Sequence, residues 1–544
     1  MSQRLMVATV VGVLLLWFAP LGSYRLFNPD EGRYAEIPRE MVASGDWVTP
    51  RLNAIKYFEK PPLHYWATAA AFAAFGEHEW TARLWVALTG FLGLLLTAWI
   101  GTRIYGAMVG ATAALVQGGA LLYLGLARMS TLDMGLTIAL ELALVGLLLL
   151  VATPAAGTRL ERGGAVLLAL GTALAFLSKG LVGILIPGAV AALYLLLRRD
   201  WRLLLRARPW WTVGALLLIG APWVLLVAQR NPEFARFFFI HEHFERFLTR
   251  VHARYEPDWF FVPVLLVGFM PWTALLPAMI ARSWRACRAG EAATWMLVLW
   301  VVFSFLFFSV SQSKLIPYIL PIFPALALLA GRCIHELPAA RLRRLLLVAA
   351  ASWLALGLLV LVLWRSPGWA TRLEINDSPA APQIATGFFI AALLCALAAW
   401  LAVRRGSLTG VAVAAFSTVV LLGVLPPAAG QLPRQRELTR LIAAVRPELL
   451  ASTAFYCVDD YEQSIPFYLR RTCTLVGYRG ELDFGLQQEP GRWLADLGLF
   501  ADRWRREASA VAVVRSTSYA RLLQMGLPMR VIYTAPSLVA VVKP

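Results

Sequence analysis

NPDEGRYAEIPREM, residues 28–41, follows directly on the first long apolar segment of the chain, residues 5–23. It begins with a carboxylate pair, Asp30 and Glu31, and continues over about three helical turns with basic, acidic and aromatic side chains: Arg33, Tyr34, Glu36, Arg39 and Glu40. A polar helix placed where an apolar helix leaves the bilayer can hold chemistry on a substrate that lies half in the membrane. This order of segments predicts a membrane protein with a functional site at one membrane surface.

A second polar segment, KYFEKPPLHY at residues 56–65, follows soon after the first. The pair Pro61-Pro62 restricts the residue before it to extended backbone, so a rigid loop would present Lys60 as a phosphate-binding group. The alternative for this segment is a membrane-surface belt in which Lys and Tyr extend toward the lipid headgroups. For Asp30 and Glu31 the alternative is an N-terminal helix cap, where acidic side chains are favoured.

The rest of the chain is strongly apolar. Of its 544 residues 59% are hydrophobic and 15% are charged, whereas a soluble protein is usually about 25% charged. The first apolar segment lacks a small-residue cleavage site and predicts a membrane helix, not a signal peptide. Runs of about 20 apolar residues, enough to span a bilayer, predict about thirteen transmembrane helices. We place them at 5–24, 82–103, 107–127, 132–153, 164–179, 181–197, 210–228, 259–281, 293–311, 315–332, 345–364, 384–402 and 410–428.

The net charge of +18 is distributed in a way that argues against nucleic-acid binding. Arginines gather in every second short loop, at residues 159–162, 198–208, 282–288, 341–344 and 404–405. Loops rich in Lys and Arg face the cytoplasm. They therefore predict a cytoplasmic N-terminus and place everything after residue 429 outside, which in a bacterium means an inner-membrane protein whose site faces the periplasm. The basic excess also favours contacts with anionic membrane lipids.

Two long outward loops, at about 24–81 and 229–258, contrast with the short basic loops of the opposite side. Both read as amphipathic helices lying at the membrane surface, with apolar side chains toward lipid and charged side chains toward water. Function is therefore expected on the outer face. We divide the chain into a transmembrane domain, residues 1–429, and a soluble domain, residues 430–544.

The soluble segment has the pattern of a small α/β domain. The runs STAFYCVDD, TCTLVGY, SAVAVV, RVIYTA and SLVAVVKP have strand character, and SIPFYLRR and PGRWLADLGLFADRWRRE are expected to be helices. Cys457 and Cys473 both lie in this domain. Because the outer location is oxidising, we expect them to form a disulfide.

Ionisable side chains at the ends of other apolar segments are further candidates. Asp133 begins the fourth segment, and Glu141 lies about two turns further along it. Lys179 and Lys314 each lie in a short outer turn between two apolar runs. Side chains of this kind mark a functional site at membrane depth, or they cap a helix (Asp133) or extend from its end to the headgroups (the two lysines).

The motif His241-Glu242-His243, with Arg246 after it, predicts a metal or phosphate site. On a helix the two histidines would point about 200° apart, so pairing of one histidine with Glu59 across space is the preferred ligand set. Zinc suits such nitrogen and oxygen ligands. The sequence contains neither GxGxxG nor a Walker loop, which favours a lipid-borne activated donor over a soluble nucleotide.

Several of these motifs occur in the same order in a known family. DEGRYAEIPREM, FEKPPLHYW, STLDMG, SKGLVGILIP, HEHFERF and SKLIPYILPIFP resemble the 4-amino-4-deoxy-L-arabinose (L-Ara4N) lipid A transferases, the ArnT family. These enzymes belong to the GT-C superfamily of polyprenyl-phosphate-dependent glycosyltransferases. The resemblance implies a GT-C fold and transfer of aminoarabinose from undecaprenyl phosphate to lipid A phosphates at the periplasmic face, with polymyxin resistance as its result. We expect a monomer.

Transferred by motif, the resemblance assigns roles to residues of this sequence. Asp30 and Asp133 are the acidic site residues, and Glu59 with the His241/His243 segment forms the metal candidate, His243 fitting the family motif better. The lipid-phosphate pocket is lined by Arg33, Tyr34, Tyr57, Lys60, Arg246, Lys314 and Tyr318, to which we add Lys179.

Two other classes compete with this interpretation. A GT-C mannosyltransferase acting on protein or glycan hydroxyls would need Asp30 as a true general base. A lipid or ion transporter would be expected to show inverted repeats and polar residues near the middle of the membrane. The polar residues of this chain gather at one face, which favours an enzyme.

Overall fold

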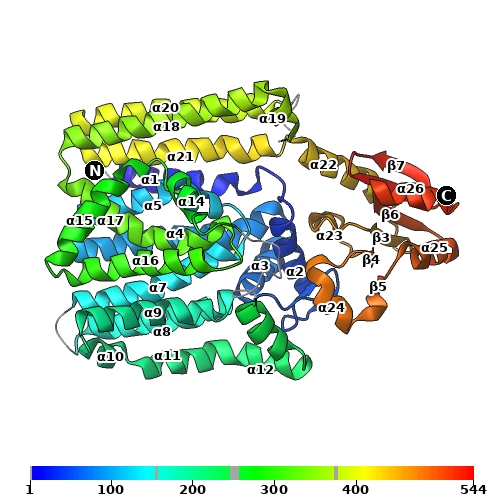
Figure 1. Ribbon diagram of the computed structural model, residues 1–544, viewed down its shortest axis with the longest axis horizontal. Helices are drawn as coiled ribbons and strands as arrows, with labels where there is room; N and C mark the ends of the chain where they lie inside the picture. The colour runs from blue at the N-terminus through cyan, green and yellow to red at the C-terminus, as the bar shows by residue number, and fades with distance from the viewer. Residues whose placement is uncertain (1–2, 154–156, 246–255, 373–377) are drawn as a thin grey trace.

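A bundle of long helices forms one end of the protein and a β-sheet domain forms the other, with α2 and α3 between them (Figure 1). The computed structural model describes residues 3–153, 157–245, 256–372 and 378–544. The side chain of His243 and the whole of Arg246 lie outside the described part of the chain.

Within those ranges, nine helices are long and apolar enough to cross a membrane. They are Glu79–Tyr105 (α4), Leu132–Ala152 (α7), Arg159–Lys179 (α8), Arg202–Arg230 (α10 to α12), Ala292–Val310 (α16), Ile316–Glu336 (η5 and α17), Ala339–Arg365 (α18), Ala380–Arg404 (α20) and Ser407–Ala429 (α21). Shorter apolar helices are Val11–Gly22 (the end of α1, with η1), Ala107–Gly119 (α5) and Val182–Arg198 (α9). α14 (Phe261–Gly268) and the helix Thr273–Arg288 are bent by 109°. The fold is therefore that of a helical, multi-pass membrane protein, as predicted.

Several predicted segments are interrupted for local reasons. The segment at 107–127 breaks at Ala120, between α5 and α6 (Leu121–Leu126). There the amide of Leu121 donates to the carbonyl of Met270, 3.0 Å away, in place of a partner in its own helix. α8 and α9 are separated at Gly180, whose φ of +70° is readily adopted only by glycine.

The C-terminal domain contains a six-stranded sheet in the order β5-β4-β3-β6-β8-β7. Its strands are Ala454–Val458 (β3), Thr474–Val476 (β4), Trp493–Leu494 (β5), Ala510–Arg515 (β6), Arg530–Thr534 (β7) and Leu538–Val542 (β8). β5, β4, β3 and β6 run parallel, and β8 is antiparallel to both β6 and β7. The five predicted strands are present. The predicted helix at 490–507 begins later than expected, because Trp493–Leu494 pairs with β4 and only Leu497–Arg506 (α25) is α-helical.

Alternate residues of the strands pack on opposite faces, as the pleat requires. Tyr456 and Val458 face a core with Phe500 and Trp504 of α25. The other helices of the domain are Pro433–Val445 (α22), Ser464–Leu469 (α23), Asp483–Gln488 (α24) and Ser516–Gln524 (α26).

The other face of the sheet packs on α2 (Asp30–Ser44), far away in sequence. Tyr34, Ile37 and Met41 of α2 share one core with Phe455 and Cys457 of β3. Residues Glu31 to Met41 are all buried. The expectation that α2 turns its charged side chains to water is therefore wrong, because the C-terminal domain covers the helix.

The backbones of α2 and α23 approach each other closely at Gly32. A Cβ atom there would lie 2.6 Å from the backbone nitrogen of Ser464. The amide of Ser464 donates to Asn28 Oδ1 at 2.9 Å, and Asn28 Nδ2 donates to Glu462 at 2.8 Å. A side chain at Gly32 would push the C-terminal domain away from the helix.

The disulfide predicted between Cys457 and Cys473 is present. The disulfide contacts the hairpin formed by Arg51–Leu52 (β1) and Ile55–Lys56 (β2) through Asn53, which lies between these two strands. Asn53 Nδ2 donates to the carbonyl of Cys473 at 2.7 Å, and Asn53 Oδ1 accepts from the backbone amide of Cys473 at 2.8 Å. The amide of Asn53 in turn donates to Glu40 of α2. Hydrogen bonds of Asn53 thus connect the disulfide, the β1–β2 hairpin and α2.

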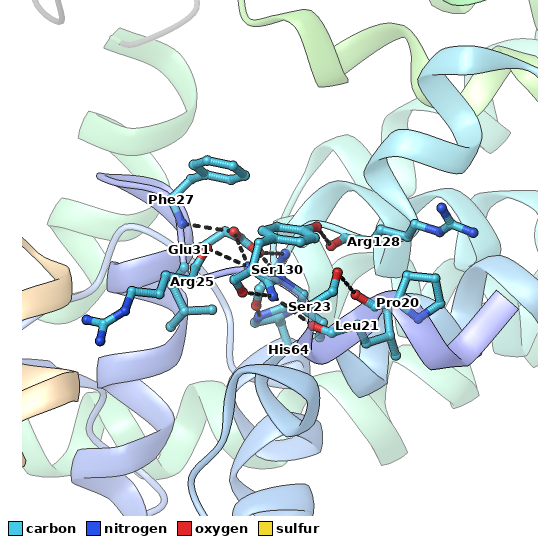
Figure 2. Close-up of polar contacts among 12 residues, drawn as sticks. Pro20, Leu21, Ser23, Arg25, Phe27, Glu31, His64, Arg128 and Ser130 are labelled. Atoms are coloured by element: carbon cyan, nitrogen blue, oxygen red, sulfur yellow. Dashed lines mark hydrogen bonds and ion pairs between the residues drawn. The ribbon is translucent and has the colours of Figure 1, made fainter. Parts of the chain in front are cut away.

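The start of α2 is fixed to the membrane bundle by a buried ion pair. The Glu31 carboxylate accepts from Nε and Nη2 of Arg83, both at 2.8 Å, and neither side chain is exposed. Arg83 also donates to the carbonyls of Leu21, Tyr24 and Arg25, so all five of its N–H groups have partners. Figure 2 shows Glu31 at the centre of these contacts, with the amides of Phe27 and Ser130 donating to the same carboxylate.

We expect Glu31→Gln to lower the free energy of unfolding by about 3–5 kcal/mol, because it leaves the Arg83 guanidinium buried without its counter-ion. Thermal unfolding of the purified protein in detergent measures the loss. Asp30→Asn is the matched control: the Asp30 side chain is 48% exposed, and its substitution should change stability by less than about 0.5 kcal/mol. Equal effects of the two substitutions would contradict the structural role of Glu31.

Candidate active site

A cleft lies where α8, η5 (Ile316–Ile322) and the end of α16 meet the loop after β2 and the π-helical segment Arg236–Glu245 (η3). Four predicted site residues line it: Glu59, Lys60, Lys179 and Tyr318. The other lining residues are Val182, Glu242, Phe307, Phe308, Ser311 and Ser313. The cleft combines two cationic side chains with aromatic and hydroxyl groups, which suits the phosphate end of an amphipathic ligand.

Each lysine of this region has a definite oxygen partner. Lys60 Nζ lies 2.9 Å from a carboxylate oxygen of Glu242 and donates to the carbonyl of Glu59 at 2.7 Å. Lys179 Nζ lies 2.6 Å from Asp133 Oδ1 and 4.1 Å from the centre of the Tyr318 ring.

Lys314 lies in the turn between α16 and η5. Its Nζ donates to the carbonyl of Glu256 at 2.8 Å and lies 3.6 Å from Asp258.

The pairing of Lys179 with Asp133 links two predicted site residues from different helices. Asp133 lies in the first turn of α7, and Lys179 is the last residue of α8. Both are largely buried, with side-chain exposures of 12% and 11%. The ion pair thus joins the start of α7 to the end of α8 beside the cleft that Lys179 lines.

A second set of predicted site residues, which we call the α2 wall, lies on and beside α2, outside the lining of the cleft itself. Arg33 lies 3.6 Å from Asp30, and its guanidinium carbon lies 5.8 Å and 6.0 Å from the ring centres of Tyr34 and Tyr57. Burial raises the pKa of Tyr34 and of Tyr57 far above the usual range, so both phenols stay protonated near neutral pH and offer neutral hydrogen-bonding groups.

The C-terminal domain contributes to this wall in a way that sequence reasoning missed. Arg33 Nε donates to Gln463 Oε1 at 2.7 Å, and Arg33 Nη2 lies 3.5 Å from Glu481. Tyr478 donates to the same Glu481 carboxylate at 3.0 Å. No local motif marks Gln463 or Glu481, because their relevance comes only from the docking of the domain on α2.

His64 and Ser130 are further residues behind the α2 wall. The His64 ring lies edge-on to Tyr34, with 5.7 Å between ring centres, and its Nε2 lies 3.5 Å from Ser130 Oγ. Burial lowers the pKa of His64 to about 3, so the imidazole is neutral at physiological pH. The sequence signal was a histidine at the start of α3 (Leu63–Phe75), beside two prolines.

Only part of the predicted metal-ligand set lies in the described part of the chain. Glu59 lines the cleft, while the His241 ring stacks on Phe237 with 5.1 Å between ring centres. Among the residues that the structure describes, no three His, Cys, Asp or Glu side chains are grouped as metal ligands would be. The side chain of His243 and all of Arg246 fall outside those residues.

The fold is shared with enzymes that use lipid-linked sugars. Residues 2–238 match the dolichyl-phosphate-mannose-protein mannosyltransferase family, and residues 441–543 match the family described as aminoarabinose transferase C-terminal domain. An oligosaccharyltransferase from Archaeoglobus fulgidus superposes with a TM-score of 0.51 at 12% identity, covering 99% of this chain and 74% of that one. The helical bundle and the two family matches define the class as a GT-C-type membrane glycosyltransferase.

More similar proteins narrow the class. A crystal structure of ArnT from Cupriavidus metallidurans bound to undecaprenyl phosphate has a TM-score of 0.91 and 35% identity, covering 100% of this chain and 99% of that one. Undecaprenyl phosphate-alpha-4-amino-4-deoxy-L-arabinose arabinosyl transferases from Pseudomonas aeruginosa (strain UCBPP-PA14) and Edwardsiella ictaluri are 32% and 31% identical. These matches cover 94% and 87% of this chain, and 93% and 86% of the relatives. The chain belongs to this arabinosyl transferase family, as its motifs predicted.

The buried imidazole of His64 makes stability depend on pH. Its pKa in the folded protein, about 3, is below the usual 6.5, so below pH 6.5 the unfolded chain binds a proton that the folded chain does not. Stability should therefore fall with decreasing pH, with His64 contributing about 1 kcal/mol between pH 6.5 and 5.5.

His64→Gln should abolish the part of this stability loss that His64 causes, about 1 kcal/mol between pH 6.5 and 5.5. Unfolding temperatures of the two proteins at pH 6.5 and 5.5 test this, and parallel losses in both would contradict the assignment.

Proposed function

We propose that this protein transfers 4-amino-4-deoxy-L-arabinose from undecaprenyl phosphate to phosphate groups of lipid A. The observation that carries the proposal is the cleft in which Lys60 and Lys179 lie beside the aromatic side chains of Phe308 and Tyr318. Two ammonium groups beside aromatic side chains suit the phosphate and the apolar chain of a prenyl phosphate. Membership of the arabinosyl transferase family supplies the sugar and the carrier.

We place the site on the periplasmic side of a bacterial inner membrane. We propose about thirteen crossings, because the nine long helices, the three shorter apolar helices and the bent pair each overlap a predicted span. The basic loops then face the cytoplasm, and the C-terminal domain, beginning near residue 430, lies outside with α2. We propose that the protein acts as a monomer in contact with membrane lipids, with no nucleic-acid partner.

The chemistry is a single displacement at the anomeric carbon. A lipid A phosphate oxygen, already anionic at neutral pH, forms the new C–O bond while the bond to undecaprenyl phosphate breaks. The leaving phosphate keeps the electron pair, so its negative charge must be stabilised. We assign this task to Lys60 and Lys179, which line the cleft, with Lys314 and Arg246 added on the family motif alone. Attack opposite the leaving group inverts the configuration.

The carboxylates act by charge and position. Asp30, half exposed at the start of α2, is proposed to orient the acceptor, or to pair with the sugar ammonium and the positive charge that develops on the ring. Asp133 holds Lys179 at 2.6 Å and so fixes this cation in the cleft. Arg33, Tyr34 and Tyr57 line the wall toward the sugar. No group has to remove a proton from the phosphate nucleophile.

Glu59 and one histidine of the His241/His243 segment remain the proposed ligands of a divalent metal, with His243 fitting the family motif better. A carboxylate and an imidazole are donors that zinc accepts, and a bound zinc ion would supply Lewis-acid stabilisation of phosphate charge. The steps above rest on the lysines and carboxylates alone. No nucleotide is expected.

The proposal is tested by mass spectrometry of lipid A from cells with and without this gene. A mass increase of one aminopentose that depends on the gene is expected, together with greater polymyxin resistance. An unchanged lipid A despite intact expression would refute the function, and a hexose-sized increase would favour the mannosyltransferase alternative.

Lys60→Met removes a cation but keeps much of the apolar side-chain stem. Loss of leaving-group stabilisation should reduce transfer at least about 100-fold, measured with purified protein, lipid-linked donor and lipid A. Lys56→Met is the control, because Lys56 pairs with Glu233 at 2.7 Å and does not line the cleft. Near-normal turnover of the Lys60 variant would contradict the proposed role.

A further inference from the structure

Glu242 is a buried carboxylate that the proposed chemistry does not use. It belongs to η3, its side chain is 1% exposed, and one of its oxygens lies 2.9 Å from Lys60 Nζ. It lines the same cleft as Glu59 and Lys179. An anion therefore occupies the side of Lys60 on which the phosphate of a prenyl-phosphate ligand would be held.

Carboxylate and phosphate oxygens accept the same charge-assisted hydrogen bonds from an ammonium group. Lys60 already donates to the carbonyl of Glu59 at 2.7 Å, so one of its three donors is used within the loop. Glu242 accepts from the same ammonium group, so a phosphate that binds Lys60 shares Lys60 with Glu242 or replaces it. If both anions stay, they repel each other, and the burial of the Glu242 side chain limits screening by water.

We propose that Glu242 is an internal competitor of the phosphate group for Lys60. By pairing with Lys60 when the cleft is empty, it avoids an unpaired buried lysine, and by repelling bound phosphate it weakens the hold on undecaprenyl phosphate. Its role in the reaction is to hasten release of the carrier once the sugar has left. This inference rests on the proposed function, since it concerns the same ligand.

A neighbouring ion pair shows that Glu242 is not needed merely to attach η3. Glu233, just before η3, pairs with Lys56 of β2 at 2.7 Å. Phe237 stacks on Phe484 of the C-terminal domain with 3.8 Å between ring centres, and Phe234 packs against Phe58. These contacts hold the segment from outside the cleft. The Lys60–Glu242 pair, by contrast, joins two residues that line the cleft.

The test measures binding of undecaprenyl phosphate alone to the full-length protein in detergent. Glu242→Gln keeps the shape of the side chain and removes its charge, so the Kd should fall about tenfold. Turnover should show a lower KM and a lower kcat, with a burst of the first product followed by slow release of the carrier. Glu233→Gln is the matched control and should bind as the wild type does.

Two further variants keep the inference testable if Glu242→Gln is poorly folded. Glu242→Ala also removes the charge and should bind more tightly, whereas Glu242→Asp retains it and should not. Folded charge-removing variants that bind undecaprenyl phosphate no more tightly than the wild type would overturn the inference and leave the proposed function intact. A wild-type protein that does not bind undecaprenyl phosphate would instead count against the proposed function.

Discussion

The buried pair of Glu31 and Arg83 is the contact on which the position of the site depends. Arg83 lies in the first turns of a membrane helix and uses every N–H group on Glu31 and on three carbonyls of the preceding loop. An ion pair of this kind is costly to remove from water and tolerates little displacement. It therefore fixes where α2 begins, and with it the orientation of Asp30, Arg33 and Tyr34.

From that fixed point, two separate parts of the chain meet at the site. The membrane bundle supplies Asp133 and Lys179 at helix ends, and the C-terminal domain holds Arg33 of α2 through Gln463 and Glu481. α2 belongs to both, because its charged start is bonded to the bundle and its apolar side shares the core of the sheet. The C-terminal domain is thus part of the α2 wall.

Local sequence signals predicted the elements well and their contacts only in part. Apolar runs and alternating strands follow from the residues themselves, whereas no local pattern predicts that Asp133 and Lys179, 46 residues apart, form an ion pair. The capping interpretation treats Asp30 and Glu31 alike and does not predict that Asp30 is half exposed while Glu31 is fully buried. That distinction depends on Arg83, which in the sequence is only a charge near the start of an apolar run. Likewise, the burial of α2 requires a domain more than four hundred residues away.

The separation of α2 from its covering sheet has a consequence for how the protein is made. Residues 30–44 are synthesised long before β3, residues 454–458. The side chains of α2 that the sheet buries are therefore uncovered until the C-terminal domain has been made. α2 can be covered only after the last segment has been translated and, at Cys457 and Cys473, oxidised. Any chain that stops short of the C-terminal sheet therefore exposes apolar side chains of α2 that the full-length protein buries.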